Sequence, residues 1–190
     1  MSTNSKQQVR NHGRSITWGT LVLLVALSLV GIASAQDDGT LKFKGAIGVI
    51  PVTGVNAATG AVNLNVVRNV NPAGPWRIAD LNATVEPNGH IVVKGRGLLL
   101  AAGNGIGTNA AASVHATLFC GAAAAANAFD EPGVALEANG DFVIDDFLTG
   151  NGPLPTACDN PVLLIRSGKV AGQGVWFAAG IQKLDTDTGK

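Results

Sequence analysis

The sequence predicts an all-β fold: an antiparallel β-sandwich, immunoglobulin-like or similar, with roughly eight or nine strands. Two observations predict it. Apolar and polar residues alternate with the period of two that is typical of half-buried strands, for example over residues 62–66. Turn signals separate these short segments, the strongest being Pro87-Asn88-Gly89, because an Asn-Gly pair accepts the positive φ of a tight hairpin.

The expected strands in the first half of the domain are residues 41–55, 62–66, 76–85 and 90–101. The first begins with alternating apolar and charged residues and continues over 46–55 as a run of the buried type, which Pro51 interrupts. Thr59-Gly60 is expected to turn the chain into the second strand. Asn88-Gly89 is expected to join the last two strands as a hairpin.

The expected strands in the second half are residues 113–120, 134–137, 141–148, 162–166 and 170–182. Asn139-Gly140 is a second hairpin signal. Gly172 and Gly174 interrupt the last strand and are expected to be bulges or tight approaches. The predicted domain therefore spans residues 36–183, and residues 184–190 are a flexible tail.

A glycine-rich stretch ends in Gly105-Ile106-Gly107-Thr108-Asn109-Ala110, which fits the G-x-G-x-x-G/A pattern of dinucleotide-binding units. That pattern needs a helix N-terminus immediately afterwards to hold the pyrophosphate. Residues 113–120 instead alternate as a strand does, although a helix that begins at Asn109 stays open because alanine favours helix. We expect a loop between two strands and no nicotinamide or flavin cofactor.

The N-terminal 35 residues have the three parts of an export signal peptide. The parts are a basic start with Lys6, Arg10 and Arg14, an apolar run over residues 21–33 and the cleavage motif Ala33-Ser34-Ala35. The apolar run is about 13 residues long and so falls short of the ~20 residues that a membrane span needs. We expect cleavage near Ala35 and a secreted, periplasmic or cell-envelope protein, with an uncleaved anchor as the alternative.

The charge balance excludes some partners. After cleavage the net charge is −3, because 3 of the 13 basic residues and none of the 13 acidic residues precede Gln36. Nucleic acid needs a basic stripe that neutralises phosphates, and the sequence offers none. We expect neither nucleic-acid binding nor membrane insertion after signal cleavage.

The two cysteines, Cys120 and Cys158, are expected to form a disulfide. An exported protein with an even number of cysteines usually pairs them. The chain has no C-x-x-C motif, so a zinc or redox site has little support.

Residues that could carry catalysis are few. His90 and His115 are the two histidines after the predicted cleavage site, and Ser113 and Ser167 are the two serines. Zinc normally takes three protein ligands in a catalytic site, and neither serine lies in G-x-S-x-G. We therefore expect the domain not to be an enzyme and read the histidines as hydrogen-bonded strand residues.

A candidate ligand surface consists of Trp76, Asp141 and Asp145. A tryptophan at a strand start could stack on a sugar ring, although core packing is the simpler interpretation. Asp141 and Asp145 share one strand face and Asp146 points to the other, so carboxylate oxygens suited to calcium are spread along a strand. A module that binds glycan or calcium is therefore the alternative function.

The segments "GPWRIADLNATVEPNGHIVVKGRGLLL", "SVHATLFC", "NGDFVIDDFL" and "CDNPVLLIR" followed by "VWFAAGI" carry a resemblance. Over roughly residues 70–182 the chain resembles an uncharacterised family of small exported bacterial β-domain proteins with one cysteine pair. The resemblance implies an exported β-domain with one disulfide. It implies no activity and supplies no catalytic residues.

Together these observations predict a non-catalytic exported domain that acts through its surface, by binding or scaffolding. The expected partner is an unknown protein or glycan. No cofactor is expected.

Overall fold

The computed structural model describes residues 39–122, 127–150 and 152–184. The chain divides into two units, residues 1–35 and residues 36–190. The predicted signal peptide and the tail from residue 185 onward lie outside the described residues. Within the part that is described, the chain forms no helix with the length and apolarity needed to cross a bilayer.

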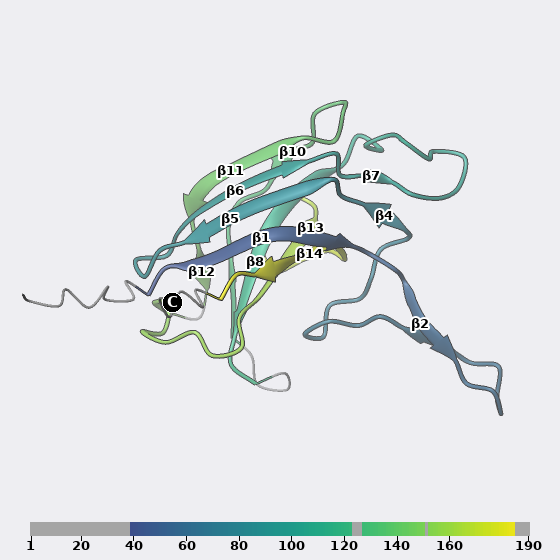
Figure 1. Cartoon of the computed structure of the whole chain (residues 1–190), viewed down its shortest axis with the longest axis horizontal. Helices are drawn as coiled ribbons and strands as arrows, with labels where there is room; N and C mark the ends of the chain where they lie inside the picture. The colour runs from purple at the N-terminus through teal and green to yellow at the C-terminus, as the bar shows by residue number, and fades with distance from the viewer. Residues whose placement is uncertain (1–38, 123–126, 151, 185–190) are drawn as a thin grey trace, which may run out of the picture. The chain divides into compact units, whose positions relative to one another are not determined.

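Ten strands form the main sheet (Figure 1). They are β1 (Leu41–Gly48), β5 (Asp80–Val85), β6 (His90–Arg96), β8 (Ser113–Cys120), β9 (Asn127–Asp130), β10 (Val134–Ala135), β11 (Phe142–Phe147), β12 (Thr149–Gly150), β13 (Val162–Ser167) and β14 (Trp176–Gln182). Their order is β11-β6-β5-β1-β14-β13-β8-β9-β12, and β10 pairs with β8. All of these pairs are antiparallel, which confirms the predicted fold class.

The two layers of the fold are halves of this one continuous sheet, which curls until it is nearly closed. β10 and β11 come into contact where the two ends of the sheet approach each other. Two small sheets accompany it, β2 (Val52–Val55) with β3 (Val62–Leu64) and β4 (Trp76–Arg77) with β7 (Leu99–Leu100).

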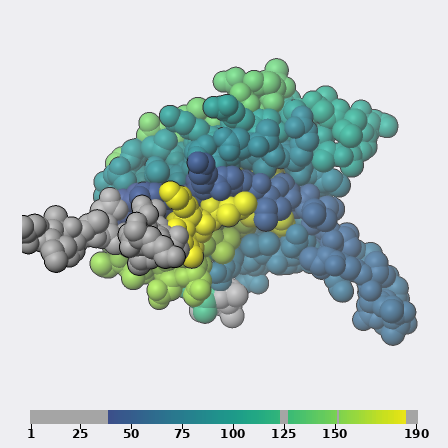
Figure 2. Space-filling view, viewed as in Figure 1, coloured from purple at the N-terminus to yellow at the C-terminus, as the bar shows by residue number. Residues whose placement is uncertain are grey.

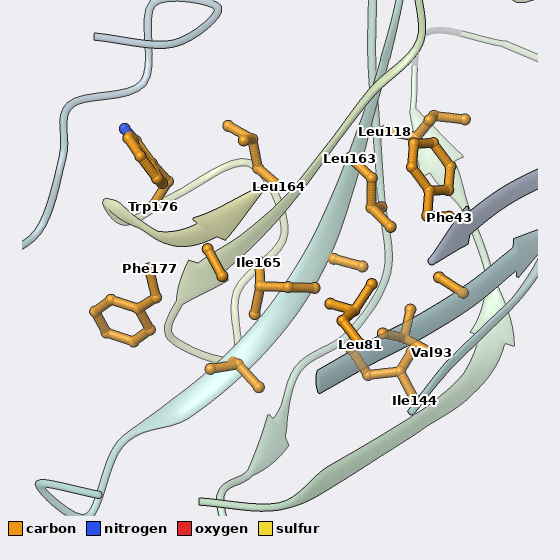
Figure 3. Close-up of a cluster of buried hydrophobic side chains, with 14 of the residues drawn as sticks. Phe43, Leu81, Val93, Leu118, Ile144, Leu163, Leu164, Ile165, Trp176 and Phe177 are labelled. Carbon is orange, nitrogen blue, oxygen red and sulfur yellow. The ribbon is translucent and has the colours of Figure 1, made fainter. Parts of the chain in front are cut away.

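The hydrophobic core lies inside the curled sheet, where apolar side chains from both halves meet (Figure 3). In β5 and β6 every second residue is buried, as the alternation of the sequence predicts. Leu81 and Val93 from these strands pack toward Leu163 of β13. Gly95 makes room for the core, because a Cβ there would lie 2.1 Å from the Phe142 ring.

β8 and β13 are buried on both faces. Leu118 and Leu163 are paired across the two strands on the face that meets the core, and Thr117 and Leu164 are paired on the opposite face. This pattern explains why residues 162–165 are a continuous apolar run rather than an alternating one.

Several expected elements differ from the structure. The expected strand at 76–85 is divided into β4 and β5, and the expected strand at 90–101 into β6 and β7, with β4 and β7 paired in a separate small sheet. The last strand begins at Trp176 rather than at residue 170. Asn139-Gly140 does form a tight turn, in which Gly140 N donates to Glu137 O at 2.8 Å, but β10 pairs with β8 rather than across this turn. Gly174 is a tight approach as predicted, because a Cβ there would lie 2.1 Å from Ser167 O.

The largest difference concerns residues 46–55. The apolar composition of this segment predicted a buried run, yet Ile47, Ile50, Val52 and Val55 are all exposed. The segment leaves the main sheet after β1 and enters the β2–β3 hairpin, which extends away from the rest of the domain (Figures 1 and 2). We call residues 50–66 the arm.

Candidate functional site

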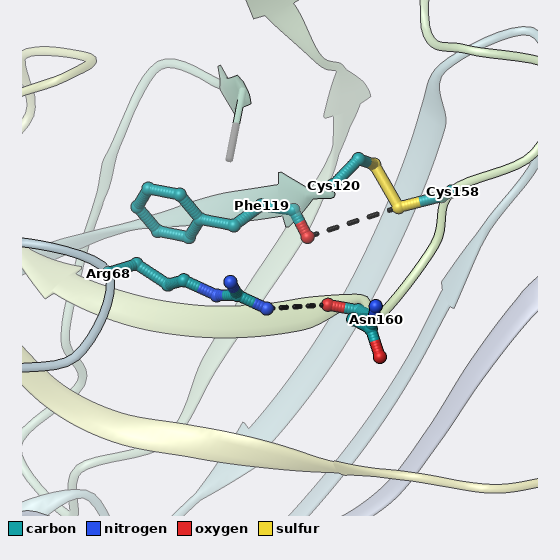
Figure 4. Close-up of a disulfide and its surroundings, with 5 residues drawn as sticks. All are labelled: Arg68, Phe119, Cys120, Cys158 and Asn160. Atoms are coloured by element: carbon teal, nitrogen blue, oxygen red, sulfur yellow. Dashed lines mark hydrogen bonds between the residues drawn. A yellow bond between two sulfur atoms is a disulfide. The ribbon is translucent and has the colours of Figure 1, made fainter. Parts of the chain in front are cut away.

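The disulfide predicted between Cys120 and Cys158 is present (Figure 4). It joins the end of β8 to the loop before β13, with a Cα–Cα distance of 4.8 Å. Cys158 Sγ also lies 3.9 Å from Phe119 O. The bridge therefore fastens the loop to the end of β8, an inner strand of the main sheet.

The base of the arm is fixed to the domain by two long-range hydrogen bonds. Trp176 Nε1 donates to Asn65 O at 2.9 Å. Arg68 Nη2 donates to Asn160 O at 2.8 Å, close to the disulfide (Figure 4). Trp176 is buried in β14, so the base of the arm is bonded to a buried side chain of the main sheet.

The arm itself is a two-stranded hairpin with its own hydrogen-bonded turn. Asn56 Oδ1 accepts bonds from Ala58 N and Thr59 N, and Asn56 N donates to Ala61 O at 2.8 Å. At the other end Asn65 Nδ2 donates to Ile50 O at 2.9 Å. These local bonds define the backbone of a hairpin that lacks a core of its own.

Apolar side chains gather on one face of the arm. Val52 is paired with Leu64, and Val55 with Val62, and cross-strand partners lie on the same face of a sheet. A register shift between Val52 and Gly54 adds one residue, which keeps Val52 and Val55 on one face although they are three positions apart.

This apolar face is open to solvent. Four of its large residues, Val52, Val55, Val62 and Leu64, are paired across the hairpin and are 38–60% exposed, and Ile50 and Val66, which follow at its open end, are 64% and 49% exposed. No charged residue lies between Lys44 and Arg68. An exposed, contiguous and uncharged apolar surface is typical of an interaction site.

Trp76 does not present its ring to a ligand. It is 6% exposed and stacks on Phe177 with ring centroids 4.2 Å apart. The sugar-stacking role considered for Trp76 is therefore wrong, because a platform needs an exposed ring face.

Asp141 and Asp145 lie on the outward face of the β11 segment, as predicted, but they have separate partners. Asp141 Oδ1 accepts a bond from Gly97 N at 2.9 Å and Asp141 Oδ2 one from Asn139 Nδ2 at 3.0 Å. Asp145 Oδ1 instead lies 2.8 Å from His90 Nε2. In the described ranges no group of three or more His, Cys, Asp or Glu side chains is placed to hold a metal ion.

His90 joins a small polar group on the surface. Its ring lies 5.1 Å from that of Phe147, and its Nδ1 is 3.6 Å from Glu86 Oε1. The hydrogen bond to Asp145, together with Glu86, raises the pKa of His90 above its ordinary value. The group links β6 to β11 across their outer face.

A second polar group was not predicted from the sequence as a unit. It lies on the face of β8 and β13 that points away from Leu118 and Leu163. Its members are His115, Thr117, Asp130 and Arg166, all buried. Asp130 accepts a bond from the Thr117 hydroxyl and lies 3.7 Å from both His115 Nε2 and Arg166 Nη1. Register brings these residues together, since Thr117 pairs with Asp130 and His115 with Arg166.

This group holds the loop between β13 and β14. Arg166 Nη2 donates to Gly172 O at 3.2 Å and to Gly174 O at 3.0 Å, and His115 Nδ1 contacts Gly168 O at 3.2 Å. Burial lowers the pKa of His115, so the ion pair is between Asp130 and Arg166. The Thr117 hydroxyl is fully buried and donates to Asp130, whereas a nucleophile must reach a substrate.

Glu131 follows β9 directly, and its buried carboxyl group lies beside β8. Its Oε1 accepts a bond from Ala116 N at 2.7 Å, at the point where β9 has ended and β10 has not begun. Burial raises the pKa of Glu131 to about 7. Its Oε2 has no hydrogen-bond partner within the described residues.

A depression of ≈ 340 Å³ lies on the outer face of β1, β5 and β6. Four lysines line it, which are Lys42, Lys44, Lys94 and Lys183. Its polar lining side chains are all exposed, so none of the described residues that line it offers a buried polar group that could orient a ligand.

The glycine-rich stretch forms a loop between β7 and β8, as predicted. Leu100 N donates to Thr108 O and Gly107 N to Leu100 O, both at 2.9 Å. The chain then enters β8 as a strand. The open alternative of a helix from Asn109 is therefore wrong.

No family model matches the chain, and searches of curated proteins and of solved structures give no match. The resemblance to small exported bacterial β-domain proteins therefore stays a prediction.

Proposed function

We propose that this chain is a non-catalytic exported β-domain that acts by binding or scaffolding, and that the arm is its contact surface. The single observation that carries the proposal is the open apolar face of the arm, with six large side chains between 38 and 64% exposed. Keeping such a face in water costs free energy that burial against a partner recovers, at roughly 25 cal/mol per Å².

The surroundings of the arm support a binding role. An isolated two-stranded hairpin is only marginally stable in water, yet this one starts from a base that Trp176 and Arg68 fix to the domain. A contact surface on a rigid base loses less conformational entropy when it binds.

The disulfide supports export, because disulfides persist in oxidising compartments. The buried position of His115, Thr117 and Asp130 supports a non-catalytic role. The glycan and calcium alternative loses its basis, since Trp76 is buried and Asp141 and Asp145 have separate partners.

The proposal is tested by measuring how much of an apolar fluorescent dye the folded protein binds. We expect Val55→Thr with Val62→Thr to lower the binding clearly, because hydroxyls replace methyl groups on the pair of the face that lies next to the turn. Val143→Thr is the matched control, since Val143 is an exposed strand valine on β11 with an exposed fraction of 58%. Equal dye binding by the arm variant and the control would refute the arm as the contact surface.

A further inference from the structure

We propose that the arm binds a second copy of this chain, with the apolar face of one arm packed against the same face of the other around a two-fold axis. The inference rests on the proposed function, because it names the partner of that surface. It is carried by three features of the arm, which are its area, its lack of charge and its projection from the domain.

The area suits a dimer. If a partner covered all the exposed surface of the six residues, the area would be at most about 500 Å² on each copy and at most about 1,000 Å² in a symmetric pair, which reaches the lower limit for a specific interface. This area counts residues of the arm only and none of the main sheet. Interfaces at this lower limit belong to weak, transient complexes, so we expect a reversible dimer that dissociates at about micromolar concentration.

The lack of charge favours a like partner. A partner chosen by electrostatic complementarity would meet charges on the arm, but none lies between Lys44 and Arg68. A two-fold contact is made from the same patch on both copies, so the patch has to complement itself. An uncharged face of valine, leucine and isoleucine meets this condition without placing like charges opposite each other.

The projection of the arm makes the contact accessible. The arm extends away from the main sheet (Figure 2), so two arms can pack face to face while the charged bodies of the domains stay apart. Sheets that pack in this way lie about 10 Å apart with side chains interdigitating. Val55 and Val62, which are paired across the hairpin, lie within the face that would be covered.

The test is sedimentation velocity over a range of concentrations, on protein purified from cells that express the full chain. We expect a reversible monomer–dimer equilibrium near micromolar concentration. Val55→Thr with Val62→Thr should weaken the dimer by about a hundredfold, because the symmetric interface would bury four unpartnered hydroxyls. Val143→Thr should leave the equilibrium unchanged. Both variants replace exposed side chains, and circular dichroism would check that each keeps the fold.

The outcomes separate this inference from the proposed function. Dimers that survive the double substitution, or a chain that stays monomeric at 100 times the expected concentration, would overturn the inference. If that monomeric chain still binds the apolar dye through the arm, the proposed function stands with another partner. Arm-dependent sedimentation of the monomer with neutral phosphatidylcholine vesicles would identify a lipid surface instead. Loss of arm-dependent dye binding as well would refute both.

Discussion

β13 and the arm have similar apolar compositions and opposite environments. Residues 162–165 in β13 are mostly buried, with Leu163 and Leu164 inaccessible to solvent, whereas the arm exposes Val55, Val62 and Leu64. β13 has a partner strand on each edge, β8 and β14. Each strand of the arm has one partner. The difference shows that burial of an apolar strand is decided by what the rest of the chain places beside it.

The same difference separates stability from binding. Substitutions in β13 act on a core that the whole domain shares, so they change the free energy of unfolding. Substitutions on the arm act on surface that folding does not cover. They should change association instead.

The largest effect on the stability of the domain should come from removing the disulfide. Replacing Cys120 and Cys158 together by alanine opens a loop between residues 38 positions apart. We expect the free energy of unfolding to fall by about 4 kcal/mol, because the unfolded chain regains the entropy of that loop. Urea denaturation of the oxidised protein and the double variant measures this. A fall below about 1 kcal/mol would contradict this entropic account and would indicate that the unfolded chain without the bridge keeps structure in this loop.

A matched pair of leucines tests the comparison directly. Leu163→Ala removes a fully buried side chain and should lower the free energy of unfolding by about 3 kcal/mol. Leu64→Ala removes an arm side chain that is half exposed, and should change it by less than about 0.5 kcal/mol. Urea denaturation at a concentration where the chain is monomeric gives both values. Similar losses for the two variants would show that the arm is part of the cooperative core.

Glu131 should make the stability of the body depend on pH. Its pKa is raised to about 7 in the folded state from an ordinary value of 4.5, because of burial. Between these values the folded chain holds more protons than the unfolded chain, so the free energy of unfolding falls as pH rises. We expect Glu131→Gln, which keeps an oxygen for Ala116 N, to be more stable than the native protein by about 3 kcal/mol at pH 8.

At pH 4.5 the Glu131→Gln variant and the native protein should have about the same stability, because both then carry a neutral side chain. The lowered pKa of His115 affects both proteins alike and cancels in their difference. A difference in stability that stays constant from pH 4.5 to pH 8 would contradict the raised pKa of Glu131. The arm has no charged residue, so dimer dissociation should change little over this range.

Much of the sheet could be predicted from the sequence. Alternation over residues 80–85 and 90–96 and the Asn88-Gly89 turn define β5 and β6 almost completely. The strand character of residues 113–120 also decided correctly against a dinucleotide-binding helix. These features are local, so a short window of sequence contains the information.

The polar group around Asp130 could not be predicted, because its members come from three strands and meet through register. Asp130 and Arg166 are far apart in the sequence, and no local pattern states that β8 lies between β9 and β13. The exposure of the arm was missed for the same reason. Its valines look like those of a core strand, and only the absence of neighbouring strands in the sheet distinguishes them.

The first and last strands of the sheet, β1 and β14, are neighbours, with Ala46 paired to Gly180. A growing chain therefore lacks the middle of its sheet until its last strand has been synthesised. Contacts between such distant segments form slowly, so the chain stays unfolded for longer. If the chain crosses a membrane unfolded, as the sequence predicts, this order of assembly would delay folding until the last strand has crossed.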